Sequence, residues 1–147
     1  MKFMQDAIEV ALQTKNEIPV GAVIVKNDEI IAFAHNKKEE LHDATAHAEI
    51  LALKMAQEGL RRWRLDDCDM YVTLEPCPMC ASAIIQSRIK NLYFGSYDKQ
   101  YGALGSAIDL RILHKSKMKV YGGIYEQDCD NILNSFFERL RWLPKKN

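Results

Sequence analysis

Two short motifs that lie far apart in the chain place the tightest constraint on how it folds. Residues 45–49 read TAHAE and residues 76–80 read PCPMC. Together they offer one imidazole, one carboxylate, and two thiols three positions apart. Thiolates and imidazole are the ligands that zinc prefers, so these side chains suit one such ion if the fold brings the motifs together.

His47, Cys77 and Cys80 are the predicted zinc ligands, and Glu49 is the carboxylate left over. A structural zinc site normally closes with four protein ligands, whereas a catalytic site has three and leaves the fourth position to water. The sequence therefore predicts one zinc ion per subunit in a catalytic site, with Glu49 placed to move protons. Either motif alone is a weak signal: a CxxC also occurs in structural zinc sites and redox sites, and a His and a Glu at a helix start are often only caps. The combination of the two motifs is specific.

Length and composition predict one domain, residues 1–147, because 48% hydrophobic residues can build a single core. No apolar run approaches the length of a membrane helix, and the first residues are too acidic for a signal peptide. Cys68 and Cys129 are too distant from each other to suggest a disulfide framework. These features favour a protein of the reducing cytoplasm with no membrane partner.

The formal net charge is zero, which by itself argues against a nucleic-acid partner. However, residues 1–80 hold 9 Lys and Arg against 14 Asp and Glu, whereas residues 81–147 hold 11 against 6. Basic residues gather within 111–119 and again within 139–146. Such clusters can meet phosphates, although a solvated surface is the simpler explanation of charge alone.

Hydrophobic periodicity predicts four helices and five strands. The helices are expected at residues 3–15, 46–58, 78–87 and 125–142, and the strands at 20–25, 30–34, 70–74, 91–95 and 119–121. Strands that alternate with helices indicate an α/β fold, here a three-layer α/β/α sandwich with a mixed sheet of about five strands. Residues 96–106 follow Gly95, contain Gly102 and Gly105, and are expected to form a long functional loop.

Several side chains are expected to fix the ends and inner faces of these helices. Asp43 and Thr45 are candidate N-caps of the second helix, and Gly59 is expected to end it. Its predicted buried residues are Ile50, Leu51, Leu53 and Met55, or their neighbours. The last helix is expected to bury Ile132, Leu133, Phe136, Phe137 and Leu140.

The pattern H-x-E followed by P-C-x-x-C is that of zinc-dependent deaminases of nucleobases. Nearly the whole chain resembles the bacterial tRNA-specific adenosine deaminases, and the resemblance rests on shared segments at 18–22, 36, 45–50, 71–77, 93–95, 102–106 and 136–137. It implies the cytidine deaminase-like α/β/α fold and a homodimer. It also implies hydrolytic deamination of the wobble adenosine in an arginine tRNA anticodon to inosine, with the anticodon stem-loop as partner.

The resemblance also implies roles for single residues. Zinc ligands fall on His47, Cys77 and Cys80, and the proton shuttle falls on Glu49. The implied substrate contacts are Asn36 at the purine, the backbone around Ala48, Pro19 and Val20 in the pocket wall, and Asp98 near the nucleotide backbone. Tyr97 and Tyr101 are candidates for stacking on neighbouring bases, although their rings could equally well cover the hydrophobic core.

Two other functions stay open from the sequence. Pro78 within the CxxC is also found in guanine deaminases, so a free-base deaminase is the nearest alternative; the glycine-rich residues 102–106 favour the tRNA enzymes. The more distant alternative is a non-catalytic binding module stabilised by zinc. Such a module needs a fourth protein ligand, and the spare candidates are Cys68, Cys129, His35, His42 and His114.

Overall fold

The structure is a computed structural model that describes residues 2–142. Five strands form one sheet in the order β2-β1-β3-β4-β5. They are β1 Gly21–Lys26, β2 Glu29–His35, β3 Asp69–Leu74, β4 Asn91–Ser96 and β5 Lys119–Tyr121. The β1 strand pairs antiparallel with β2 and β3, whereas β3, β4 and β5 run parallel. The predicted mixed sheet is confirmed.

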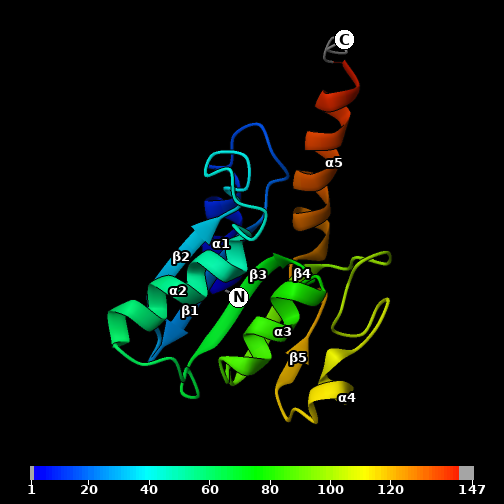
Figure 1. Cartoon of the computed structure of the whole chain (residues 1–147). Coiled ribbons are helices and arrows are strands. Elements are labelled where there is room, and N and C mark those ends of the chain that lie inside the picture. Colours follow the sequence, from blue (N-terminus) through cyan, green and yellow to red (C-terminus); the bar gives the residue numbers. More distant parts are fainter. Residues whose placement is uncertain (1, 143–147) are drawn as a thin grey trace.

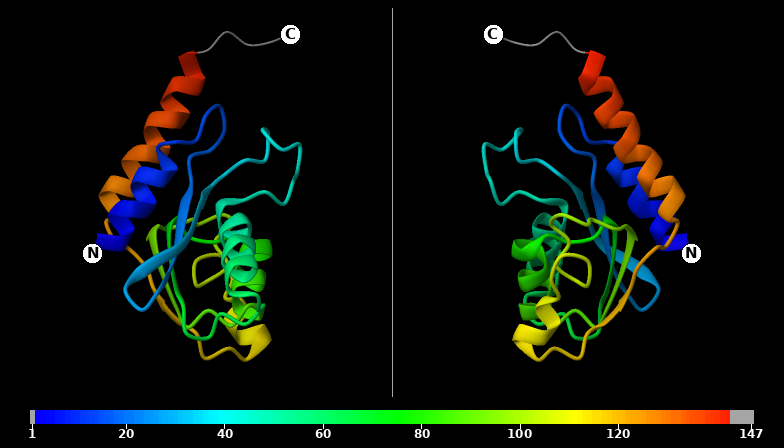
Figure 2. Two further views of the ribbon diagram at one scale, coloured as in Figure 1. Left: turned by 90° about the vertical axis from the view of Figure 1, so that its left-hand side faces the viewer. Right: turned by 90° about the vertical axis from the view of Figure 1, so that its right-hand side faces the viewer.

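Five helices cover the two faces of this sheet. They are α1 Lys2–Ala11, α2 Ala48–Leu60, α3 Pro78–Gln86, α4 Leu110–His114 and α5 Glu126–Trp142. The edge-on views show α2 and α3 on one face and α1 and α5 on the other, which confirms three layers (Figures 1 and 2). The short α4 was not predicted, and α1 ends four residues earlier than expected. Within residues 2–142, none of the helices has the length and apolar character needed to span a bilayer.

A tight hairpin and a crossover set the strand directions that position the site. Lys26 pairs with Glu29, so Asn27 and Asp28 form a two-residue turn with φ angles of 50° and 61°. Asn and Asp tolerate this left-handed backbone, which matches the twist of an antiparallel hairpin. The chain then passes from β3 through α3 to the parallel β4. The carboxyl end of β3 therefore leads directly into residues 76–80.

The sheet separates two hydrophobic cores. Met70 and Val72 of β3 point into the larger core beneath α2 and α3, together with Ile24 and Leu92. Tyr71, between them, belongs to the smaller core on the α1 side. Successive strand side chains point to opposite faces, so an apolar strand covered by helices on both sides contributes to both cores.

Helix α2 packs on the sheet through small side chains. Ala48, Ala52 and Ala56 are buried at a spacing of four residues, and Leu53 is buried as predicted. The prediction for Met55 was wrong, because 44% of that residue is exposed. Ile50 and Leu51 are only partly buried, because the alanine stripe is the face that meets the sheet.

The end of α2 also differs from the sequence prediction. The helix continues through Gly59 to Leu60, and Arg61 takes the left-handed conformation, with φ of 53°. Its backbone N–H bonds back to the carbonyl groups of Gln57 and Glu58. Glycine is the usual residue at such a position, but this hydrogen bonding satisfies the helix end with an arginine.

Helix α5 extends beyond the sheet that it packs on (Figure 1). It contacts β4, and its buried residues are Cys129 and Phe136. Phe137 and Leu140 were predicted to face inward, but they are 44% and 47% exposed. The sequence shows that this helix carries apolar residues, but it does not show where the underlying sheet ends.

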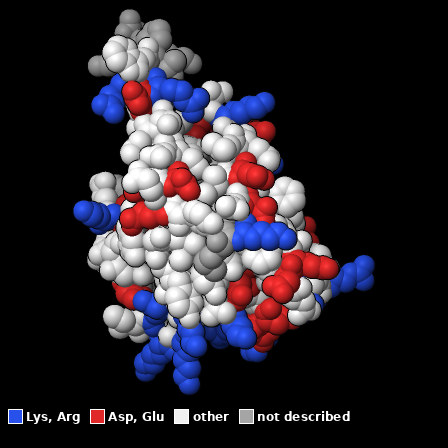
Figure 3. Space-filling view, turned by 180° about the vertical axis from the view of Figure 1, so that it is seen from behind, with Lys and Arg blue, Asp and Glu red and all other residues white. Residues whose placement is uncertain are grey.

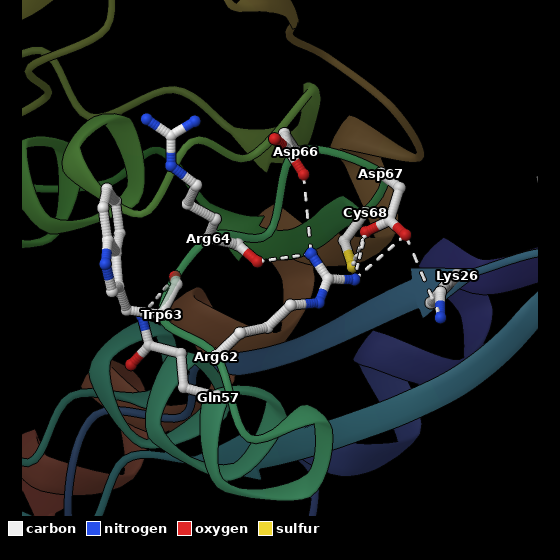
Figure 4. A network of polar contacts seen from close by, with 8 residues as sticks. All are labelled: Lys26, Gln57, Arg62, Trp63, Arg64, Asp66, Asp67 and Cys68. Carbon is white, nitrogen blue, oxygen red and sulfur yellow. Dashed lines mark hydrogen bonds and ion pairs between the residues drawn. The ribbon is translucent and has the colours of Figure 1, made fainter.

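A polar network joins the segment after α2 to the hairpin (Figure 4). Arg62 Nη2 lies 2.8 and 3.0 Å from the two carboxylate oxygens of Asp67, and Lys26 Nζ lies 3.9 Å from the same carboxylate. The neighbouring Cys68 is buried, and burial raises the pKa of its thiol to about 12. Cys68 therefore stays a protonated thiol at neutral pH.

Replacing Gly21 by Ala tests the close contact between β1 and α1. A Cβ atom at Gly21 would overlap the backbone of Ala7 and Ala11 in α1. We expect Gly21→Ala to lower the free energy of unfolding by about 2 kcal/mol, the usual cost of overpacking. Denaturant unfolding at saturating zinc measures this change.

Gly59→Ala is the matched control for that substitution. Gly59 lies within α2, and a Cβ there meets no atom within 4 Å. Alanine is the better helix former, so this variant should gain about 1 kcal/mol. Equal effects of the two substitutions would contradict the contact between β1 and α1.

Candidate active site

The two sequence motifs meet because α2 and α3 begin side by side. His47 is the N-cap residue of α2 and Cys77 is the N-cap residue of α3, both with extended backbone. Pro78 stands in the first turn of α3, as predicted, where its missing N–H costs nothing. Neither side chain makes the usual N-cap hydrogen bond. Both side chains are therefore available to a ligand.

The distances among the three donors fit one zinc ion. The Nδ1 atom of His47 lies 3.4 Å from Cys80 Sγ and 3.8 Å from Cys77 Sγ. Zinc bonds of about 2.0–2.1 Å to nitrogen and about 2.3 Å to sulfur, at tetrahedral angles, require a nitrogen–sulfur separation of about 3.5 Å. The observed separations bracket this value. All three donor atoms lie within 4.8 Å of one another.

The electrostatic environment favours thiolate at this position. Hydrogen bonds, first with Cys80 and second with His47, lower the pKa of the Cys77 thiol to about 4. The same contact with Cys77, together with burial, raises the pKa of Cys80. The two sulfurs thus share one proton, which a cation bound between them would displace. The N-terminus of α3 adds positive potential at both sulfurs.

Glu49 is held inside the protein beside this cluster. It lies in the first turn of α2 and is only 4% exposed. Burial raises the pKa of its carboxyl group to about 7, and the negative charge of Cys77 contributes to the rise. A carboxyl group with such a pKa is able both to take up and to release a proton near neutral pH.

Within residues 2–142, the cluster has three protein donors. Among residues 2–142, no further His, Cys, Asp or Glu places a ligand atom within the 4.8 Å group. Three of the spare candidates have other contacts: Cys68 with Asp67, His114 with Ser82, and His35 with the carbonyl of Asn36. The binding-module alternative needs a fourth ligand, which the described part of the chain does not provide.

The predicted helix caps, Asp43 and Thr45, bond to each other instead. Asp43 Oδ1 accepts hydrogen bonds from the backbone N–H and the hydroxyl of Thr45, at 2.8 and 2.7 Å. The hydroxyl bond lowers the pKa of Asp43. This cap prediction was wrong because the helix begins later, at a histidine that serves the metal cluster.

Asn36 connects three segments next to the cluster. Its Oδ1 accepts a hydrogen bond from the N–H of Ala48 at 2.8 Å, and its Nδ2 donates to the carbonyl of Ile18 at 2.9 Å. An amide group has a second N–H and further acceptor capacity beyond these two bonds. A hollow of about 750 Å³ lies beside Asn36, between residues 13–17 and 35–40.

Three other predicted substrate residues, Pro19, Val20 and Ala48, lie at or next to the residues that Asn36 bonds to. Pro19 and Val20 are buried immediately before β1, and the carbonyl of Val20 accepts the N–H of Asn36. Pro19 also lines a hollow on the α1 and α5 side, which it shares with Arg139. Ala48 is fully buried, and its N–H is the group bound by Asn36.

Asp98 organises a turn in the loop after β4. Its Oδ1 accepts from the N–H groups of Gln100 and Tyr101, at 3.1 and 3.0 Å. Tyr97 and Tyr101 on either side are 50% and 60% exposed. The ring of Tyr97 also meets Phe94 edge-on, so it partly covers the core as well.

Sequence reasoning assigned no role to Glu75, although it lies two residues before Cys77. It is 2% exposed, and its carboxylate accepts hydrogen bonds from residues 98, 104 and 106. An acid between a buried strand and Pro76 was the available signal, because a buried carboxylate requires donors. The donors themselves come from a distant segment, so only the folded structure identifies them.

Comparisons with known proteins agree with this site. The family model for the cytidine and deoxycytidylate deaminase zinc-binding region matches residues 1–96. The tRNA-specific adenosine deaminase of Bacillus subtilis (strain 168) is 42% identical over 145 residues, which cover 95% of this chain and 89% of that protein.

Two solved structures place the fold among deaminases. A structure of a tRNA:A34 deaminase has a TM-score of 0.83 and 40% identity, and the match covers 90% of this chain and 99% of that one. The guanine deaminase of Nitrosomonas europaea has a TM-score of 0.71 over 92% of this chain and 79% of that one. At 23% identity it shares the fold alone.

The fold, the three donors and the family match define a zinc-dependent deaminase enzyme. The predicted fold class, enzyme class and cofactor are thereby confirmed. At the identity and coverage of its relatives, the chain belongs to the family of tRNA-specific adenosine deaminases.

Removing one thiol tests the donor set. We expect Cys77→Ala to purify with almost no zinc, against about one ion per chain in the unmodified protein, because two ligands hold zinc poorly. Cys129→Ala is the matched control, because Cys129 is buried in the smaller core, away from the cluster. Metal analysis of the purified proteins measures both, and zinc retained by Cys77→Ala would rule out this ligand.

Proposed function

We propose that this chain converts the wobble adenosine of an arginine tRNA anticodon to inosine by hydrolytic deamination. The observation that carries the proposal is the three-donor cluster with Glu49 buried beside it, in a chain 42% identical to a tRNA-specific adenosine deaminase. Three ligands leave a position for water, which a hydrolytic enzyme needs.

The proposed chemistry assigns proton movement to Glu49. Zinc held by His47, Cys77 and Cys80 would lower the pKa of water and so supply the activated nucleophile. The Glu49 carboxylate would take one proton from the attacking water and pass it to ring nitrogen N1, and would then pass the proton of the new C6 hydroxyl group to the departing amine. Water adds its oxygen at C6 of adenine, the C6–N bond breaks, and ammonia leaves. The burial of Glu49 keeps this proton from exchanging freely with solvent.

The proposed substrate contacts surround the cluster. Asn36 would meet the purine with the hydrogen-bonding capacity that remains on its amide group. Ala48, at the start of α2, would bring its backbone near the base, and Pro19 and Val20 would form the neighbouring wall. Asp98 would lie near the nucleotide backbone, since its loop is bonded to the segment that precedes Cys77.

An anticodon loop suits a site of this kind. A deaminase must take its target base out of the stack, and an unpaired wobble base makes this step cheap. Tyr97 and Tyr101 expose aromatic rings on which flanking bases can stack. These two side chains lie on the same loop as Asp98, so one segment would bind several nucleotides.

Phosphate contacts need basic side chains that are not already paired. Arg111 is engaged by Asp109, with Nη2 and Oδ2 at 2.7 Å. Lys119 pairs in register with the first residue of β4, at the end of the sheet opposite the metal cluster. Figure 3, which shows the molecule from behind, has Lys and Arg gathered at the base and near the far end, with several Asp and Glu side chains between them. RNA contacts near the metal cluster would therefore depend more on hydrogen bonding and base stacking than on Arg111 and Lys119.

A homodimer of single-domain subunits in the cytoplasm completes the proposal. Apolar side chains are exposed on the helices that share one face: Met55 on α2, Met79 on α3, and Ile112 and Leu113 on α4. An exposed apolar surface of this kind supports association of two copies. All four cysteines are free thiols, which suits a reducing compartment.

The alternative substrate, free guanine, is favoured by one observation. The guanine deaminase of Nitrosomonas europaea shares this fold, and Pro78 within the CxxC is compatible with that activity. The zinc-loaded protein should be offered an arginine-tRNA anticodon stem-loop and free guanine in parallel. We expect inosine in the stem-loop and no ammonia from guanine; the reverse result would replace the tRNA proposal with free-base deamination.

The same assay tests Glu49 by substitution. Glu49→Gln should retain zinc but lose about 10⁴-fold in turnover, because an amide cannot shuttle a proton. Glu58→Gln makes the same change at an exposed position of the same helix and should keep full activity. Near-normal turnover by Glu49→Gln would show that another group moves the proton.

A further inference from the structure

Glu75 is a buried acid that neither the metal cluster nor the proposed proton path uses. It stands between the end of β3 and Pro76, and 2% of it is exposed. Removing a carboxylate from water is costly unless hydrogen-bond donors replace the lost solvent. The donors that meet this carboxylate therefore indicate what it does.

Four donors reach Glu75, and all belong to the segment of residues 97–106. Oε1 accepts from the N–H of Asp98 at 3.1 Å and from the Ser106 hydroxyl at 2.5 Å. Oε2 accepts from the N–H groups of Leu104 and Ser106, at 3.2 and 3.1 Å. One carboxylate thus holds both ends of this loop, which we call the 97–106 loop.

Backbone contacts bring the same loop against the metal-binding motif. The N–H of Glu75 donates to the carbonyl of Ser96 at 2.8 Å, and the N–H of Ala103 donates to the carbonyl of Pro76 at 2.9 Å. Gly102 leaves room for the carboxyl group, because a Cβ there would overlap it. The loop is therefore built around Glu75, which directly precedes Pro76 and Cys77 in the chain.

We propose that Glu75 is a positioning residue that fixes the 97–106 loop relative to the metal cluster and thereby sets how substrate RNA is held. The loop carries Asp98 and the exposed rings of Tyr97 and Tyr101. Glu75 touches none of the reacting atoms; it acts through these side chains on the nucleotides that flank the target base. The RNA part of this inference rests on the proposed function, whereas the positioning of the loop does not.

The substitution Glu75→Gln changes this arrangement in a specific way. The amide oxygen can take the place of Oε2 and still accept from Leu104 and Ser106. The amide nitrogen then faces the N–H of Asp98, which loses its acceptor, while the Ser106 hydroxyl can turn and accept from that nitrogen. The variant keeps the size of the side chain and releases mainly the Asp98 end of the loop.

Amide hydrogen exchange and steady-state kinetics test the proposal together. For Glu75→Gln we expect about one zinc per chain, exchange about 10-fold faster at Asp98 and its loop neighbours, and unchanged exchange in β3 and β4. With the stem-loop substrate we expect KM to rise about 10-fold with little change in kcat, because binding is lost equally in the ground and transition states. Asp67→Asn is the matched acid-to-amide control, in the distant network of Figure 4, and should leave all these values unchanged.

The outcomes separate positioning from a general structural role. Faster exchange throughout the sheet, or loss of zinc, would mean that Glu75 supports the fold as a whole and would overturn the proposal. Unchanged exchange in the 97–106 loop would overturn it as well. If Glu75→Gln does not fold, Ser106→Ala tests the same proposal, because it removes a single hydrogen-bond donor from an exposed residue. In Ser106→Ala the amides of the 97–106 loop should exchange faster, and the protein should keep its zinc. If the unmodified protein does not deaminate the stem-loop, the proposed function fails, but the exchange result still decides whether Glu75 positions the loop.

Discussion

The convergence of two helix N-termini is the constraint on which the rest of the site depends. The first residues of α2 and α3 meet at one end of the sheet, and each helix presents its cap side chain to the same point. N-caps are usually Ser, Thr, Asp or Asn, which bond to their own helix. His47 and Cys77 give up that bond, and the positive ends of both helix dipoles then favour the thiolates that a metal ion needs.

Two buried glutamates near the cluster differ in their surroundings, and their environments assign them different roles. Glu49 lies among the metal donors, and burial raises its pKa to about 7, which suits proton transfer. Glu75 accepts four hydrogen bonds from one loop, an arrangement that suits a side chain held in one position. A glutamate thus suits proton transfer at position 49 and fixes a loop at position 75, because the number of hydrogen-bond donors around the two carboxyl groups differs.

The sequence predicts most of the fold because its strands alternate or run apolar between clear turns. It also predicts the metal donors, because few residue types bind zinc and their combination is specific. It misleads where tertiary contacts override local preference: Asp43 and Thr45 look like caps, yet the helix starts at His47. Met55 looks like core, but α2 lies on the sheet through alanines. The donors to Glu75 come from a segment more than twenty residues further on, which no local pattern connects to it.

We infer that zinc is held by two sulfurs and one imidazole, with a fourth position left for water. X-ray absorption at the zinc edge of the purified, zinc-loaded protein measures the ligands directly. We expect two sulfur atoms at about 2.3 Å and two nitrogen or oxygen atoms at about 2.0–2.1 Å. Three or more sulfur atoms would indicate a closed structural site and would contradict the catalytic assignment.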